Sequence, residues 1–164
     1  MPSTAQTAPH QATALLRAAG LRVTGQRLAV YDEVVRRPHA DADSIAVATR
    51  AVLGRISTQA VYDVLRALTA AGLVRRIEPA GSPARYEARV GDNHHHLVCR
   101  RCGALGDVDC AVGSAPCLEP VADAGFTVDE AEVTYWGLCA ACTAAASDGI
   151  SPSTTSPPLH GGAS

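Results

Sequence analysis

Four cysteines carry the clearest chemical signal in the chain. Cys99 and Cys102 form one CxxC knuckle, and Cys139 and Cys142 form a second. Two residues between the cysteines let both thiolates of a knuckle face one tetrahedral ion, and thiolate ligands prefer zinc. Four sulfurs close the coordination shell, so we expect a structural Zn(II) ion and not a catalytic one. Four buried free thiols are the alternative interpretation.

Two further cysteines, Cys110 and Cys117, fall outside the paired knuckles. A free cysteine is commonly a small buried apolar residue. Cys110 and Cys117 could instead form a redox pair. Both interpretations stay open.

A run of three histidines directly precedes the first knuckle. In a strand, His94 and His96 point to one side and His95 to the other. Two imidazoles, with Glu87 before them and Asp107 after them, would form a mixed nitrogen and oxygen site suited to Fe(II), Mn(II) or zinc. His39, in a PHAD loop, is a candidate ligand from another part of the chain. A solvated loop is the alternative.

The first half of the chain predicts four short helices followed by a hairpin. The expected bounds are Thr13 to a stop at Gly20, the cap Thr24 to about Arg36, about Asp43 to Leu53, and the cap Ser57 to Gly72. The segments LVRRIE and RYEARV, joined by PAGSPA, read as two strands around a turn. This order is the plan of a winged helix-turn-helix, in which the last helix enters the DNA major groove and the wing touches the backbone.

Charge favours the same interpretation. Residues 1–92 carry a net charge of +4, whereas residues 93–164 carry −6. A polar helix face is most often only a solvated surface. The order of elements and the cationic first half move the balance toward double-stranded DNA. The fourth helix and the wing supply the candidate contacts Ser57, Thr58, Gln59, Tyr62, Arg66, Arg75 and Arg76.

The second half predicts a small strand-rich lobe. LVC and ALGDVD are expected strands flanking the first knuckle, residues 116–124 a short helix, and FTVDEAEVTYWGLCAAC a long alternating strand that ends in the second knuckle. The fold class is therefore α+β, with a winged helix-turn-helix followed by a small α/β dimerisation lobe with a four-cysteine zinc site. We expect a flexible N-terminus at 1–12, a DNA-binding domain at 13–90, a zinc-binding dimerisation domain at 91–144 and a disordered tail at 145–164.

The composition favours a fold that is stabilised by a bound metal or a dimer interface. Only 4% of the 164 residues are aromatic, so any core is built mainly from small side chains. Small side chains bury little apolar area, which favours an additional metal or a dimer interface. No targeting segment and no 18-residue apolar run is visible, so we expect a cytoplasmic protein without membrane contact. In that reducing compartment cysteines serve better as metal ligands than as disulfides.

The sequence resembles the ferric uptake regulator (Fur) superfamily of iron, zinc and peroxide sensors. The matching pieces are GLRVTGQRLAV, PHADADSI, ISTQAVYDVLRALTAAGLV, RYEARVGDNHHHLVCRRCG and YWGLCAAC, in the family's order, over roughly residues 13–142. The segments VGDNHHHLVCRRCG, DVDCAVGSAPC and DEAEVTYWGLC are similar to the branch of Fur-like repressors encoded beside catalase-peroxidase genes.

The resemblance implies specific roles. The four cysteines match the family's structural zinc ligands. Tyr62 matches the recognition-helix tyrosine that packs on bases, and Arg27 matches the arginine near the start of the second helix. The family's regulatory metal ligands correspond to His39, Glu87, His94, His96 and Asp107.

Three positions depart from the family pattern. Asp63 stands where the family usually has arginine, and an acid there would repel phosphate. Ala131 occupies the position of a ligand of the third metal site of iron-uptake members, so that site is not expected. The family's peroxide sensors favour Asp where Glu87 stands, while Asp107 fits them.

The expected function is a homodimeric, metal-dependent repressor of a palindromic operator, sensing peroxide, iron or both, and not an enzyme. Peroxide could act by oxidising a ligand histidine through Fe(II), or by oxidising cysteines. An iron-level regulator is the alternative within the family. Two other classes remain: a small metalloenzyme using the His and acid site, and a zinc-ribbon interaction module.

Overall fold

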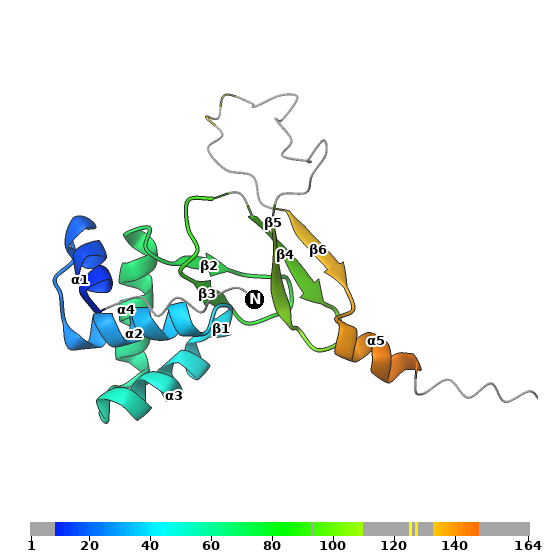
Figure 1. Cartoon of the computed structure of the whole chain (residues 1–164), viewed down its shortest axis with the longest axis horizontal. Helices are drawn as coiled ribbons and strands as arrows, with labels where there is room; N and C mark the ends of the chain where they lie inside the picture. Colours follow the sequence, from blue (N-terminus) through cyan, green and yellow to red (C-terminus); the bar gives the residue numbers. More distant parts are fainter. Residues whose placement is uncertain (1–8, 93, 110–124, 126, 128–132, 148–164) are drawn as a thin grey trace, which may run out of the picture.

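The fold has two lobes joined by a short connection (Figure 1). The computed structural model describes residues 9–92, 94–109, 125, 127 and 133–147. The first lobe, residues 9–87, contains four helices and a small sheet, and the second lobe, residues 94–147, contains another sheet and a helix. The expected α+β class is confirmed. Cys110, Cys117, Ala131, the helix expected at 116–124 and the tail from residue 148 lie outside the described residues.

The helices of the first lobe begin at side-chain caps. Thr24 and Ser57 accept hydrogen bonds from Arg27 N and Ala60 N as expected, and Asp41 accepts one from Ser44 N. Gly72, at φ +67°, follows the fourth helix in the left-handed region, which suits glycine. The helices are α1 Pro9–Ala18, α2 Gly25–Arg36, α3 Ala42–Leu53 and α4 Thr58–Ala70.

The first helix begins earlier than the expected Thr13. Ala12 and Leu16, one turn apart, are both fully buried. They pack with Val30, Leu65 and Leu68 in one core shared by the four helices. Placing Ala12 in that core requires a helical turn before it, so α1 includes residues that sequence reasoning assigned to a loose N-terminus.

The wing is a three-stranded sheet, one strand larger than the expected hairpin. Its strands are β1 Ala40–Asp41, β2 Arg75–Ile77 and β3 Arg85–Glu87, in the order β1-β3-β2, all antiparallel. Tyr86 in the central strand pairs with Arg76 on one side and Ala40 on the other. This pairing brings the loop that carries His39 beside the end of β3, and the His39 N–H donates to Tyr86 O at 2.9 Å.

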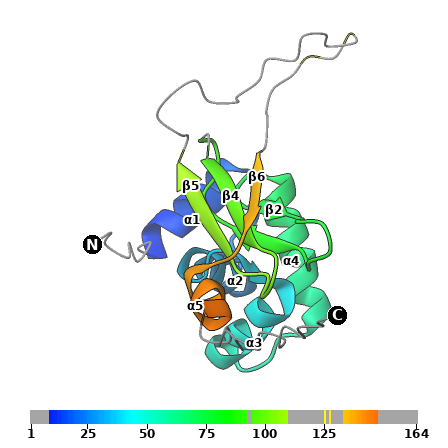
Figure 2. The ribbon, with the colours of Figure 1, turned by 90° about the vertical axis from the view of Figure 1, so that its right-hand side faces the viewer.

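The second lobe is built on the strand that starts with the three histidines. Its elements are β4 His94–Cys99, β5 Leu105–Asp109, β6 Thr134–Gly137 and α5 Ala140–Ser147. The sheet order is β5-β4-β6, with β5 antiparallel and β6 parallel to the central β4 (Figure 2). Helix α5 was not expected, and it crosses the domain boundary drawn at residue 144.

Among its described residues, the second lobe has a minimal apolar core. Val98 and Cys99 are its buried apolar residues, whereas Leu97, Tyr135 and Leu138 are exposed. So small a core fits a lobe that depends on a metal and on a covered sheet face. Among the described helices, none combines the length and the apolar character that a membrane span requires.

Candidate metal centres and nucleic-acid interface

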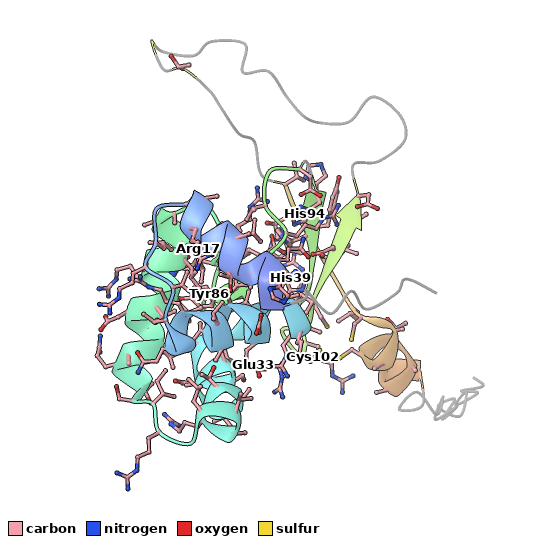
Figure 3. All side chains as sticks on the ribbon, turned by 60° about the vertical axis from the view of Figure 1, so that its left-hand side comes forward. Arg17, Glu33, His39, Tyr86, His94 and Cys102 are labelled. Atoms are coloured by element: carbon pink, nitrogen blue, oxygen red, sulfur yellow. The ribbon has the colours of Figure 1, made fainter. Side chains whose placement is uncertain are left out.

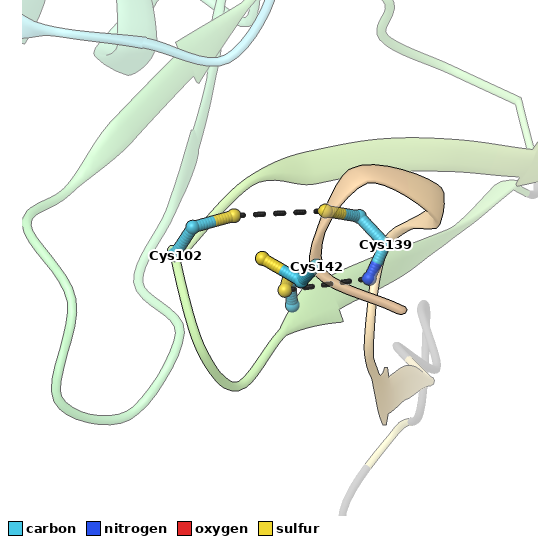
Figure 4. A group of neighbouring side chains, drawn as sticks. Cys102, Cys139 and Cys142 are labelled. Atoms are coloured by element: carbon cyan, nitrogen blue, oxygen red, sulfur yellow. Dashed lines mark hydrogen bonds between the residues drawn. The ribbon is translucent and has the colours of Figure 1, made fainter. Parts of the chain in front are cut away.

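The two cysteine knuckles meet at the end of the second sheet. Cys99 ends β4, Cys102 lies in the following turn, and Cys139 and Cys142 lie at the start of α5 (Figure 4). One sulfur from each of the four lies within 4.8 Å of the others. The Cys102 and Cys139 sulfurs are 3.7 Å apart. Four sulfurs at the zinc–thiolate bond length around a tetrahedral ion are separated by roughly 3.8 Å, so the spacing fits zinc.

The four thiols differ in acidity. Hydrogen bonds from backbone N–H groups, first that of Cys139 and then that of Cys102, lower the pKa of Cys99 to about 6. Hydrogen bonds with the Cys102 and Cys139 side chains raise the pKa of Cys142 to about 12. Cys99 is therefore the first thiolate available to a metal. Zinc must displace the proton of Cys142, so its binding releases protons.

A second cluster lies between the lobes. His39 and Glu87 come from the first lobe, and His96 and Asp107 come from the second. One potential ligand atom from each residue lies within 4.8 Å of the others. His39 Nε2 is 3.0 Å from Glu87 Oε2 and 2.7 Å from Asp107 Oδ1. His96 Nε2 is 3.5 Å from the same Glu87 oxygen and 3.8 Å from the same Asp107 oxygen.

The local backbone structure orients the four side chains of this cluster. His39 has a φ of +64°, which is uncommon for a residue with a Cβ, and its backbone is held by the edge of the wing sheet. Glu87 ends β3, and its side chain is 1% exposed. His96 and Asp107 are direct partners across β4 and β5, so they share one face of that sheet.

His94 lies at the margin of this cluster, on the same face of β4 as His96. Its Nε2 is 2.9 Å from Glu87 Oε1, and its Nδ1 is 2.8 Å from Asp92 Oδ1. Its ring centroid lies 4.9 Å from that of His96. Figure 3 shows His39 and His94 on the sides of the two lobes that face each other. The expected ligand His94 thus touches the cluster through Glu87.

Contacts within the cluster shift the pKa values of His39 and Glu87 in opposite directions. Burial lowers the pKa of His39, but the hydrogen bond with Glu87 and the charge of Asp107 outweigh burial and raise it overall. Burial raises the pKa of Glu87, but the hydrogen bond from His39 and the charges of His94 and His96 bring it below its usual value. In the metal-free cluster, Glu87 therefore stays ionised and His39 holds a proton. A divalent cation would bind the carboxylate and displace that proton.

We expect Mn(II) affinity at this cluster to rise with pH until the raised pKa of His39 is passed, because the cation must displace the proton that His39 holds. The slope should approach about tenfold per pH unit below the raised pKa of His39 and flatten above it. In the metal-free protein, the His39 contribution to stability is present below pH 6.5 and lost as pH rises. The Glu87 contribution is present above pH 4.5 and lost as pH falls. Titration of Mn(II) binding from pH 5.5 to 8 checks this, and a pH-independent affinity would contradict it.

The candidate DNA contacts at the start of α4 already have structural tasks. Ser57 Oγ caps the helix by accepting from Ala60 N, and Thr58 Oγ1 accepts from Arg50 Nη2 at 2.6 Å. Arg50 Nε also donates to Ile56 O, so it ties α3 to the turn before α4. These contacts fix the angle between the two helices, which the recognition geometry of a helix-turn-helix requires.

The exposed face of α4 carries the other candidates. Gln59 Nε2 donates to Asp63 Oδ1 at 3.0 Å, and Arg66 Nη1 lies 3.7 Å from the same oxygen. Tyr62 is 39% exposed, and the charge of Asp43 raises the pKa of its hydroxyl. Tyr62 and Arg66 line a cavity of about 690 Å³ that reaches the wing.

Three of the predicted arginine contacts lie outside α4. Arg27 Nη1 donates to Arg22 O and lines a hollow of about 410 Å³ between the start of α2 and α4. Arg75 and Arg76 lie in β2 of the wing, and Arg76 makes two hydrogen bonds to Glu78, at 2.8 and 2.6 Å. The predicted contact residues therefore come from α2, α4 and the wing.

Sequence reasoning missed Arg89 and Asp92, in the connection between the lobes. Arg89 Nε is 2.6 Å from Asp92 Oδ2, and Arg89 Nη2 is 2.6 Å from Asp109 Oδ1. Asp92 in turn contacts His94. The signal available in the sequence was the spacing of charges directly before the histidine run, in RVGDNHHH.

Comparison with known proteins gives consistent matches. The family model described as "Ferric uptake regulator family" matches residues 18–136. The Transcriptional regulator FurA of Mycobacterium tuberculosis is 63% identical over 128 residues, covering 78% of this chain and 87% of that protein. The Peroxide-responsive repressor PerR of Staphylococcus epidermidis is 29% identical, covering 81% and 89%. The crystal structure of the Vibrio cholerae ferric uptake regulator, described with rearranged DNA-binding domains, has a TM-score of 0.58 at 26% identity and covers 77% and 98%.

Proposed function

Because the chain belongs to the ferric uptake regulator family and is a transcriptional regulator, we propose that a divalent metal between its two lobes controls its binding to DNA. The observation that carries this proposal is the four-residue cluster of His39, Glu87, His96 and Asp107, with two residues from each lobe. A cation held by all four favours one orientation of the lobes, because it binds that orientation more tightly. His94, beside Glu87, is the fifth proposed ligand.

The donor set selects the class of metal. Imidazole nitrogens and carboxylate oxygens suit Fe(II) or Mn(II), while the four sulfurs of the cysteine cluster suit a structural Zn(II) ion. The two clusters have different roles. Zinc ties the knuckle after β4 to the start of α5, and the regulatory metal connects the lobes.

The DNA partner is proposed to be a palindromic double-stranded operator bound by a homodimer. Two-fold symmetry places two recognition helices in successive major grooves, and the metal-favoured orientation sets their spacing. Leu97 and Tyr135 are paired neighbours on β4 and β6 and are exposed, so they offer an apolar sheet face for dimerisation. A regulator of this kind acts in the cytoplasm, where the DNA is.

Two stimuli remain as candidates for releasing the repressor. For peroxide sensing, Fe(II) would supply local reduction of peroxide, and the oxidation would fall on a ligand histidine; similarity to PerR and the match of Asp107 support this route. For iron sensing, loss of Fe(II) alone would release DNA; the family name and the V. cholerae relative support that route at least equally. Catalase-peroxidase and other oxidative-stress genes are the proposed targets of the first route.

One binding experiment separates the two stimuli. Zinc-loaded full-length protein is bound to DNA from its own promoter with Fe(II) or Mn(II), anaerobically, before and after micromolar peroxide. Release of the Fe(II) form with retention of the Mn(II) form supports peroxide sensing through iron. Retention of both forms supports iron-level sensing, and release of both places the switch on the cysteines. The variants Cys110→Ser and Cys117→Ser should keep the response if iron carries it.

Asp63 is expected to weaken DNA binding. Its carboxylate is 57% exposed on the recognition helix, close to Arg66 and to approaching phosphates. Asp63→Asn keeps an acceptor for Gln59 but removes the charge. We expect affinity for operator and non-operator DNA to rise together by about two- to fivefold, the size of an exposed charge interaction. Gel shifts over a salt series check this, and equal or weaker binding would contradict the proposed orientation of α4.

A further inference from the structure

Arg89 contacts three carboxylates, one in the connection between the lobes and two on strand β5. It lies between β3 and β4. Its Nε is 2.6 Å from Asp92 Oδ2 and its Nη2 is 2.6 Å from Asp109 Oδ1. Its Nη1 is 3.9 Å from Asp107 Oδ2. The planar guanidinium therefore ties the inter-lobe connection to strand β5.

Two of these carboxylates use their other oxygen on a histidine. Asp92 Oδ1 lies 2.8 Å from His94 Nδ1, and Asp107 Oδ1 lies 2.7 Å from His39 Nε2. Asp92 therefore contacts the Nδ1 edge of the His94 ring, while the Nε2 edge faces Glu87 Oε1 at 2.9 Å.

We propose that Arg89 is a positioning residue of the inter-lobe metal cluster, acting through Asp107 on one side and through Asp92 and His94 on the other. This rests on the proposed function, in which the cluster binds a divalent metal. Arg89 orients Asp107, holds the orientation of the His94 ring through Asp92, and restrains the connection between the lobes. Carboxylates that orient metal-bound histidines are a recurrent support of metal sites.

A simple ion-pair role predicts a different outcome. Exposed ion pairs usually contribute little, and removing a cation beside a metal site strengthens the attraction for the metal. Arg89 is 38% exposed and Asp107 is 28% exposed, so solvent screens this charge effect. Loss of orientation at two residues should therefore exceed the gain in attraction. Arg89→Lys keeps the positive charge but removes the planar guanidinium and its paired N–H donors. It therefore separates the effect of lost orientation from the effect of lost charge.

The test uses zinc-loaded full-length protein and measures Mn(II) binding by electron paramagnetic resonance of the free ion. Arg89→Ala and Arg89→Lys should both weaken binding by about 10- to 100-fold, the usual effect of altering an outer-sphere partner. Asp109→Asn, which removes only the partner on β5, should weaken it less. Arg36→Ala is the control for the loss of an arginine, because Arg36 pairs with the buried Glu33 on α2, outside the cluster.

A second readout reports positioning directly. In metal-free protein, the imidazole NMR signals of His94 should keep their wild-type chemical shifts in Arg36→Ala and should move in Arg89→Ala, because the ring loses the orientation that Asp92 gives it. Wild-type Mn(II) affinity in both Arg89 variants, or tighter binding in Arg89→Ala, overturns the proposal. If Arg89→Ala loses its fold, Asp109→Asn and Arg89→Lys decide. If the wild type itself binds no Mn(II), the proposed function fails and this inference fails with it.

Discussion

Replacement of Cys139 by serine is expected to abolish zinc binding and unfold the second lobe. Cys139 supplies one of four clustered sulfurs, and its backbone N–H also donates to Cys99 Sγ at 3.4 Å. A serine hydroxyl is a poor substitute for a thiolate on zinc. Structural zinc sites of this type bind with about 10–16 kcal/mol of apparent free energy, which is also folding free energy.

The effect should be large because little else holds this lobe together. Val98 and Cys99 are the buried apolar residues among those described in it, so apolar packing cannot replace the metal. Trp136 lies on β6 beside Val98, with Arg100 over its ring at 5.3 Å, and it is the only tryptophan of the chain. Its fluorescence therefore reports the state of this lobe.

The measurement combines zinc content with Trp136 emission during heating. Cys139→Ser should retain essentially no zinc and show no cooperative transition by Trp136, while the helical signal of the first lobe persists. Cys110→Ser is the control, since Cys110 is not proposed as a zinc ligand. A Cys139→Ser protein that keeps one zinc ion and the wild-type transition would contradict the four-cysteine site.

Replacement of His96 by alanine is expected to remove the regulatory metal while leaving zinc in place. His96 is fully buried and faces Glu87 and Asp107. Mn(II) affinity should fall by more than about a hundredfold, because changes outside the first coordination sphere already cost about 10- to 100-fold. Operator DNA binding should then no longer respond to Mn(II).

His95→Ala is the matched control for that variant. His95 is the adjacent residue on β4, is 2% exposed, and lies on the opposite side of the strand, where its ring approaches Tyr135. The two substitutions remove the same side chain at nearly the same burial. Only His96→Ala should lose Mn(II)-dependent DNA binding; equal loss in both variants would indicate general destabilisation of β4 and contradict the assigned ligand face.

Local patterns were sufficient to predict much of the fold. The caps Thr24 and Ser57 were visible because a hydroxyl precedes an amphipathic run, and these helices begin where expected. The segment LVC was expected as a strand, and β4 extends it back through the three histidines. The burial of the histidines did not follow from the sequence, since a solvated loop was the alternative, and all three are buried.

Features that depend on distant contacts were not predictable. Strand β1 has only two residues and exists because Ala40 pairs with Tyr86, so it has no periodicity of its own. Helix α5 is alanine-rich with no polar or apolar stripe, and its residues were assigned partly to the second knuckle and partly to the tail from residue 145. Arg89 was an ordinary surface residue in the sequence, because its partner Asp109 is distant in the chain.

The coupling of metal and DNA is tested most directly by measuring it in both directions. Operator affinity of zinc-loaded protein is measured with and without Mn(II), and Mn(II) affinity is measured with and without DNA from its own promoter. A metal that favours the DNA-binding orientation of the lobes must tighten DNA binding, and DNA must tighten Mn(II) binding by the same factor, typically about 5- to 150-fold. Equal DNA affinity with and without Mn(II) would contradict control of DNA binding by the inter-lobe cluster.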